Sequence, residues 1–291
     1  MTHEIRLRAS DRTRRRDGSR HFKSVRIAST LFYVRVEQEG VIRRFEVDVE
    51  AAPSGQTNAY LLGDGSVLID PATPINELDL DPARIDHVAV THTHPDHVEG
   101  LRSIRERTDA TVWAHGCYTK RFLRHTGVEP DRTFGEGTVV GATGVSVRWT
   151  PGHSPDHVVF EDEDGAVVGD LARASGSVMV GVPDGDMRAY LTSLRRLLVG
   201  GVETAYPGHG PPIEDPTGRF ARVIAHRLDR EAAVETAVRN GAREVSEIVD
   251  AAYEKDLAGN RDLAARTVIA HLEKLSVEGR VSWDGSVAHP S

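Results

Sequence analysis

Short alternations of apolar and polar residues dominate the first two thirds of the chain. The side chains of a half-buried strand point alternately to two faces, so this pattern predicts strands. The Gly63-Asp64-Gly65 stretch between two such segments is typical of a hairpin turn that needs positive φ. We expect strands at residues 31–36, 43–49, 57–62, 67–70, 87–90, 110–114, 145–149 and 167–170, the second of which begins the folded domain.

Apolar residues at helical spacing appear between and after these strands. Val98, Leu101 and Ile104 recur as on one helix face, residues 118–125 are amphipathic, and residues 187–198 carry a longer apolar stripe. After Pro216 the pattern is helical only. Its apolar stripes lie at residues 220–228, 245–252 and 263–275, and a short hairpin pattern follows at 280–285. Three helices and a small hairpin are typical of a winged helix.

The alternation of strands with helices indicates an α/β fold followed by a small helical domain. A chain of 291 residues with 39% hydrophobic content is long enough for one large domain and one small one. We expect three segments: a basic N-terminal arm at 1–40, an α/β domain at 41–217 and a winged-helix-like domain at 218–291.

The net charge of −8 conceals three unlike segments. Residues 1–30 carry nine Lys and Arg against three Asp and Glu, residues 218–291 have a net charge of −1, and the segment between them has −13. A basic arm can grip a polyanion, but a short arginine-rich terminus without apolar periodicity is more often a disordered tail, which we expect here. A winged helix of balanced charge offers no basic face for duplex DNA, so we expect a packing element or substrate lid.

Cysteine content and targeting signals bear on disulfides and on the expected location. The single cysteine, Cys117, excludes an internal disulfide, and we expect it to be a small buried side chain. No apolar run approaches membrane-spanning length, and no secretory signal is visible, so the cytoplasm is the expected location and no membrane partner is expected.

The densest chemistry lies in Thr91-His92-Thr93-His94-Pro95-Asp96-His97, directly after an apolar strand. His92 and His94 have the i, i+2 spacing of extended chain, which sends both side chains to one face. Pro95 disfavours helix at the residue before it, so the loop stays open until a helix begins. Imidazole and carboxylate are ligands suited to Zn²⁺, and the stretch therefore predicts a metal site.

This T-H-x-H-x-D-H stretch resembles the motif of the metallo-β-lactamase superfamily. Three further motifs follow in the family's order: Pro151-Gly152-His153, Gly169-Asp170 after a strand, and Gly208-His209-Gly210. The resemblance covers about residues 43–217. It implies a catalytic domain of four layers, αββα, with two sheets between helices. The sequence after His209 also resembles the lactamase-β-like subgroup, whose members end in a winged helix.

The resemblance implies two zinc ions. His92, His94 and His153 would bind one, Asp96, His97 and His209 would bind the other, and Asp170 would bridge both. The implied reaction is hydrolysis by a hydroxide held between the metals. Asp96 would have a catalytic role as well, orienting that water or moving its proton. Asp70 is expected to brace the histidine loop, and we assign neither His115 nor His125 to metal.

Several alternatives stay open at this point. Three related classes do not fit this sequence. Lactamases of class B1 have cysteine in place of Asp170, and flavo-diiron proteins have glutamate in place of His94. The β-CASP nucleases carry a large insertion, for which this chain has no room. In the lactamase-β-like subgroup, the substrate is either single-stranded RNA or an acyl thioester. A glyoxalase II-like hydroxyacylglutathione hydrolase and a mononuclear iron persulfide dioxygenase remain alternatives, as does a non-catalytic nucleic-acid-binding protein.

Overall fold

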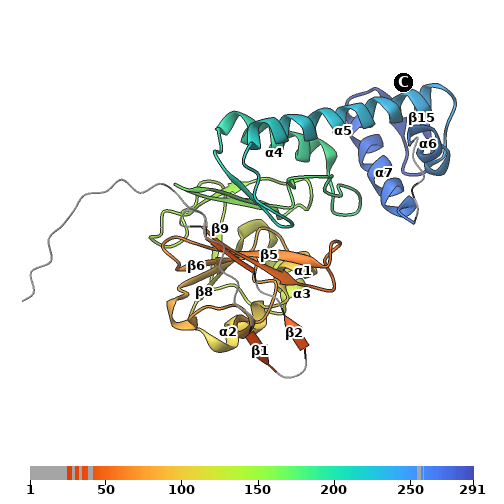
Figure 1. The fold of residues 1–291 in the computed structure, drawn as a ribbon. Helices are drawn as coiled ribbons and strands as arrows, with labels where there is room; N and C mark the ends of the chain where they lie inside the picture. Colours follow the sequence, from red (N-terminus) through yellow and green to blue (C-terminus); the bar gives the residue numbers. More distant parts are fainter. Residues whose placement is uncertain (1–24, 28–29, 33–34, 39–41, 254–256, 258) are drawn as a thin grey trace, which may run out of the picture.

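The computed structural model describes residues 25–27, 30–32, 35–38, 42–253, 257 and 259–291, and its centre is a pair of stacked sheets (Figure 1). The first sheet follows the sequence order, with antiparallel neighbours from β3 to β6 and parallel neighbours from β6 to β9. Its strands are β3 (Arg35–Gln38), β4 (Arg43–Asp48), β5 (Gln56–Leu62), β6 (Val67–Ile69), β7 (His87–Ala89), β8 (Thr111–His115) and β9 (Arg132–Phe134).

The second sheet has four strands, also in sequence order: β10 (Ser146–Trp149), β11 (Val158–Asp162), β12 (Gly165–Gly169) and β13 (Ala205–Pro207). The last two are parallel, and the other neighbours are antiparallel. A separate pair, β1 (Val25–Ile27) and β2 (Thr30–Phe32), precedes the sandwich.

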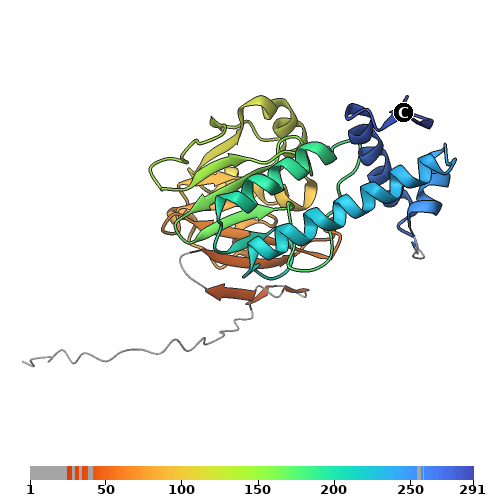
Figure 2. The same ribbon diagram turned by 90° about the horizontal axis from the view of Figure 1, so that it is seen from above.

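Helices cover the outer face of each sheet. The first sheet is covered by α1 (Pro95–Val98), α2 (Leu101–Arg107) and α3 (Thr119–Thr126), with 3-10 turns η1 (Ile75–Glu77), η2 (Pro82–Arg84) and η3 (Gly116–Tyr118). The second sheet is covered by α4 (Met187–Gly200) and the start of α5 (Pro216–Arg239). Figure 2 shows α4 and α5 lying across that sheet.

Alternation along the strands builds the cores between these layers. In β5, Tyr60 and Leu62 point into the core between the sheets, whereas Ala59 and Leu61 point into the core under α2 and α3. In β11, Phe160 lies between the sheets and Val159 faces α4. Because both faces of each sheet are covered, the layers are αββα, as the resemblance implied.

The C-terminal region has its own core. The C-terminal half of α5 packs with α6 (Val245–Ala252), α7 (Arg261–Val277) and the hairpin β14 (Val281–Trp283) and β15 (Ala288–Pro290). These are the three helices and small hairpin that the sequence predicts. The predicted boundary between residues 217 and 218 lies in the first turn of α5, and the division into three segments stays a prediction.

Three sequence predictions are wrong in detail. The strand predicted at 31–36 is two strands, of which β2 pairs with β1 and β3 pairs with β4. The helix predicted through Val98, Leu101 and Ile104 is two helices, α1 and α2. Cys117 is exposed, because it lies on the short turn η3 after β8. The Gly63-Asp64-Gly65 turn is confirmed, with φ of 58°, 56° and 84°.

The N-terminal arm falls mostly outside the described residues, which begin at Val25, so the disordered tail stays a prediction. Of the helices in the described part of the chain, none has both the length and the apolar character that a membrane span requires. The cytoplasmic location stays a prediction too.

Candidate metal centre

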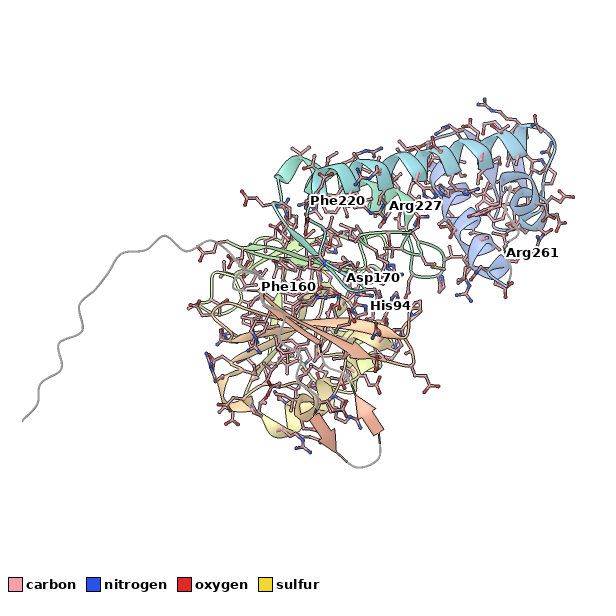
Figure 3. All side chains as sticks on the ribbon, viewed as in Figure 1. His94, Phe160, Asp170, Phe220, Arg227 and Arg261 are labelled. Atoms are coloured by element: carbon pink, nitrogen blue, oxygen red, sulfur yellow. The ribbon has the colours of Figure 1, made fainter. Side chains whose placement is uncertain are left out.

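The seven residues predicted as metal ligands come together at one edge of the sandwich. His92 follows β7, His153 follows β10, Asp170 follows β12 and His209 follows β13. These strands run in the same direction within their sheets, so their carboxyl ends meet at this edge. Figure 3 shows His94 and Asp170 beside each other there, on the side that faces the C-terminal helices.

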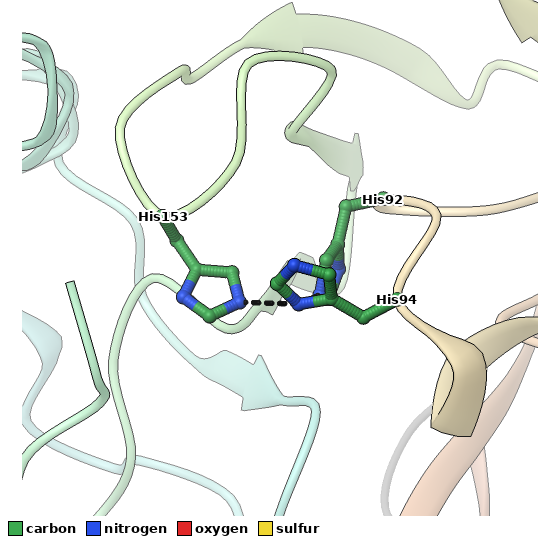
Figure 4. A group of neighbouring side chains, drawn as sticks. All are labelled: His92, His94 and His153. Atoms are coloured by element: carbon green, nitrogen blue, oxygen red, sulfur yellow. Dashed lines mark hydrogen bonds between the residues drawn. The ribbon is translucent and has the colours of Figure 1, made fainter. Parts of the chain in front are cut away.

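His92, His94 and His153 form the first group (Figure 4). His94 Nδ1 lies 3.0 Å from His92 Nε2 and 2.9 Å from His153 Nε2. The i, i+2 spacing places His92 and His94 on one side of the loop, as the sequence predicts, and His153 arrives from the second sheet. Three ring nitrogens therefore converge on one point.

Asp96, His97 and His209 form the second group. Asp96 Oδ2 lies 3.4 Å from His209 Nε2 and 3.8 Å from His97 Nε2. Asp96 and His97 are in the short helix α1, which begins at Pro95 directly after the extended loop. The change from loop to helix turns these two side chains away from the first group.

Asp170 lies between the two groups. Its Oδ2 is 3.6 Å from His153 Nε2, and its Oδ1 is 3.3 Å from His209 Nε2 and 3.8 Å from His97 Nε2. One carboxylate therefore presents a different oxygen to each group. This is the placement that a bridging ligand requires.

Each imidazole is held at the ring nitrogen that faces away from the cluster. Four rings turn Nε2 inward, and only His94 turns Nδ1 inward among the five. The outer partners are Thr91 Oγ1 for His92 (3.1 Å), Asp184 Oδ2 for His94 (3.3 Å), Asp70 Oδ2 for His97 (2.9 Å), the Met179 carbonyl for His153 (2.8 Å) and the Gln56 carbonyl for His209 (2.7 Å). Such outer contacts fix the tautomer and orientation of a metal-binding ring.

Buried polar atoms at the centre fit a cation. His97 Nε2, His209 Nε2 and Asp170 Oδ1 are buried and make no hydrogen bond of acceptable geometry. Buried polar atoms are almost always satisfied, so three orphaned atoms facing one another need a ligand. Nitrogen and carboxylate oxygen donors in this number suit a transition-metal ion, and the residues present fit zinc.

The pKa values of His92 and His153 favour neutral rings. Burial lowers the pKa of His92 well below its usual value, and burial lowers the pKa of His153 to about 4. Burial opposes the charge on Asp170 as well, but its contacts with His209, His97 and His153 hold its pKa well below the usual range. Neutral imidazole and ionised carboxylate are the forms that bind metal.

His209 and His97, both of the second group, are the exceptions. Burial opposes the charge on His209, but its contact with Asp170 raises its pKa. The pKa of His97 is raised as well. Burial favours its neutral form, but Asp70, Asp170 and Asp96 together raise its pKa to about 9.

Asp70 braces the histidine loop, as predicted. Its carboxylate accepts hydrogen bonds from the Thr91 amide (2.6 Å) and the Thr91 hydroxyl (2.7 Å), and it also contacts His97. Because the Thr91 hydroxyl donates to Asp70, its oxygen is the acceptor for His92 Nδ1, which leaves His92 Nε2 free to face the cluster. Asp70 itself is outside both ligand groups and is not grouped with Asp170.

His115 and His125 also lie outside these groups. His115 Nδ1 accepts from the Cys117 amide, and His125 Nδ1 lies 2.9 Å from the Thr93 carbonyl. Both rings have structural contacts.

The sequence analysis missed a set of polar residues that hold the ligand loops. Asn58 donates to the carbonyls of Pro207 and Gly210, and the Tyr60 hydroxyl donates to the same Pro207 carbonyl, so β5 fixes the loop that carries His209. Two other charged residues come from distant segments: Asp184 contacts His94 of the first group, and Arg121 binds Asp184.

Comparison with known proteins fits this architecture. The family model described as metallo-beta-lactamase superfamily matches residues 52–209, which is more than half of the chain. A beta-lactamase-like protein 2 homolog of Drosophila melanogaster is 30% identical over 268 residues, covering 83% of this chain and 89% of that protein. The chain belongs to the metallo-beta-lactamase superfamily. Membership, together with relatives named as thioesterases, makes the chain a hydrolase and sets the non-catalytic alternative aside.

Further matches extend the similarity to the C-terminal domain. The model of a beta-lactamase associated winged helix domain matches residues 245–288, which confirms the predicted winged helix. A protein of Paecilomyces divaricatus named atrochrysone carboxyl ACP thioesterase AgnL7 is 29% identical, over 78% of this chain and 76% of that one. The crystal structure of a metallo-beta-lactamase family protein from Thermus thermophilus has a TM-score of 0.70 at 23% identity, covering 86% and 99% of the two chains, and shares the fold.

Proposed function

We propose that the protein is a dinuclear zinc hydrolase that cleaves acyl thioesters. The position of Asp170 carries this proposal, because its two carboxylate oxygens face two separate ligand groups. With Asp170 shared, each ion would have four protein ligands: three histidines for the first, and Asp96, His97 and His209 for the second.

Two zinc ions bound there would lower the pKa of a water between them and polarise the acyl carbonyl. Side chains of the protein would orient the water and transfer its proton. Thr57 contacts Asp96 Oδ2 at 3.4 Å, which orients this carboxylate beside His209. In our proposal Asp96 positions the attacking water and transfers its proton to the departing thiolate.

The substrate class is proposed from two lines of support. Relatives named as acyl carrier protein thioesterases, from Paecilomyces divaricatus and Aspergillus terreus, align with 78% and 80% of the chain. The net charge of −13 over residues 31–217 is unfavourable for a polyanion such as RNA. Neither argument depends on the metal geometry.

A panel of substrates tests the proposal. Zinc-loaded protein would be assayed with acyl-pantetheine and acyl carrier protein thioesters, lactoylglutathione, single-stranded RNA and a chromogenic cephalosporin. We expect kcat/KM for the acyl-pantetheine and acyl carrier protein thioesters to exceed that for the glutathione thioester and the other substrates by about 100-fold, because only differential transition-state binding discriminates among them.

Asp170→Asn is the matched control for this panel. It keeps the size of the side chain but removes the charge that would bridge the ions, so all turnover should fall together with the second equivalent of zinc. Preferred cleavage of lactoylglutathione would favour the glyoxalase II-like alternative. Cleavage of RNA alone would replace the thioester assignment by the endonuclease.

A further inference from the structure

The loop between β12 and α4 brings an unassigned carboxylate to the first ligand group. Asp184 Oδ2 lies 3.3 Å from His94 Nε2, on the side of the ring opposite to His92 and His153. His94 is the only ring of the five that turns Nδ1 toward the cluster. It is also more exposed than the other four, with 26% of its side chain accessible. Its orientation therefore depends on few packing contacts.

Arg121 of α3 holds Asp184 in place. Its Nη1 and Nη2 donate to the two carboxylate oxygens of Asp184 at 3.0 and 2.6 Å, a bidentate pair with a fixed geometry. The same guanidinium donates through Nε to the Thr93 hydroxyl at 3.0 Å, and its Nε is 3.2 Å from Asp156 Oδ1.

Asp156 completes the connection between the loops. Its carboxylate accepts from the Thr93 amide (3.1 Å) and the Thr93 hydroxyl (2.7 Å), and from the Ser154 hydroxyl (2.5 Å). Thr93 stands between His92 and His94, and Ser154 follows His153. Arg121 thus links Asp184 to both loops that supply the first group.

We propose that Asp184, oriented by Arg121, is a positioning residue that keeps the His94 proton on Nε2 and so presents Nδ1 as the metal ligand. An imidazole has two tautomers of similar energy, and the acceptor at one nitrogen decides which nitrogen is left for the metal. Without that acceptor, the ring can carry its proton on Nδ1, which cannot then bind a cation.

The winged helix supports the loop from the other side. The Val182 amide donates to the Arg266 carbonyl of α7 at 3.4 Å. A Cβ atom added to Gly181 would lie 2.8 Å from the Arg266 carbonyl carbon, so only glycine allows this approach. The loop that carries Asp184 is therefore fixed between α3 and α7.

The test compares Asp184→Ala with Asp186→Ala, a matched control two residues away. Asp186 caps α4 through the amides of Arg188 and Ala189, so its loss destabilises the same loop without touching His94. This inference rests on the proposed metal set, and zinc affinity at both sites would be measured by chelator competition. The His94 tautomer would be read from ring ¹⁵N shifts of metal-free protein.

We expect Asp184→Ala to weaken the first site by about 10- to 100-fold, to leave the second within about threefold, and to move the His94 proton from Nε2 toward Nδ1. Asp186→Ala should lower the melting temperature but change neither affinity nor tautomer. Unchanged affinity and tautomer in Asp184→Ala would overturn the inference, as would an equal loss at both sites in both variants. Wild-type protein that binds no zinc would refute the proposed function instead, and the tautomer measurement, which needs no metal, would still decide the role of Asp184.

Discussion

The start of α5 should contribute to the stability of the catalytic domain, although the sequence pattern assigns it to the C-terminal one. Phe220 is 1% exposed and packs with α4 and the outer face of the second sheet. Asp215 caps the helix by accepting from the Gly218 amide at 2.8 Å, and Pro216 occupies its first turn. These features fix the direction in which α5 leaves the metal loop.

Phe220→Ala should therefore lower the free energy of unfolding by about 3–5 kcal/mol, the usual cost of removing a buried aromatic side chain from a packed core. For a domain of this size the loss corresponds to roughly 10 °C in melting temperature. Urea unfolding followed by circular dichroism measures it, with EDTA present so that bound metal adds no stability.

Leu228→Ala is the matched control, because Leu228 lies on the same helix but is 38% exposed. Its cost should be about 1 kcal/mol or less. A cost for Phe220→Ala no larger than this would refute the packing argument. If the argument holds, a chain cut at residue 217 loses part of the catalytic core and should not fold stably.

Three further predictions concern the metal ligands, the charged core of the C-terminal domain and the N-terminal arm. His92→Ala combined with His94→Ala should abolish hydrolysis and lower metal content; two full equivalents by metal analysis would contradict it. Glu231→Gln should cost about 3 kcal/mol, because buried Glu231 accepts from both Lys274 (2.9 Å) and Arg280 (2.8 Å), and Gln removes the charge that these cations share and leaves Lys274 only the more exposed Glu278. Burial opposes the charge on Glu231, but His271 and Lys274 lower its pKa to about 2, so the stability difference in urea unfolding should be full above pH 4.5 and shrink toward pH 2; a pH-independent difference would count against it. Removing residues 1–30 should leave melting temperature and turnover unchanged, and a clear loss of either would show that the arm is structural or binds substrate.

Local patterns predicted most of the fold and a metal site at the first histidine stretch, whereas His153, Asp170 and His209 were predicted through the resemblance to the family. Strand alternation and the i, i+2 spacing of His92 and His94 are set by the backbone itself, so they can be read from neighbouring residues. The break between α1 and α2 could not be read in this way. Val98 and Ile104 keep helical spacing because both face one core. The helix is nevertheless interrupted before Leu101, and at Gly100 an added Cβ would lie 1.9 Å from the Thr73 carbonyl oxygen.

Long-range polar contacts were the part that the sequence could not predict. Asp184 meets Arg121 and His94 across 63 and 90 residues of chain, and no local spacing encodes such a contact. The bracing role of Asp70 could be predicted, because this residue ends the strand beside the histidine loop and its position in the sheet places it next to that loop. A loop residue that orients a ligand through a long-range contact can therefore be identified only once the fold is known.

The winged helix of this chain is proposed to be a packing element that does not read duplex DNA. The face of α7 at Arg266 and Ala270 contacts the catalytic domain, with Ala270 buried beside α4. Sequence reading would need side chains of α7 that reach base edges in the major groove. Lys274 is instead 7% exposed and bound to Glu231, and Arg261 forms an ion pair with Asp250.

With two of its three cationic side chains engaged and a domain charge of −1, α7 lacks the electrostatic attraction on which duplex affinity depends. We expect no detectable binding to duplex DNA at physiological salt, measured by fluorescence anisotropy with the full-length protein. Sequence-specific binding in that assay would refute the proposal, because it would require α7 to leave the loop that carries Asp184.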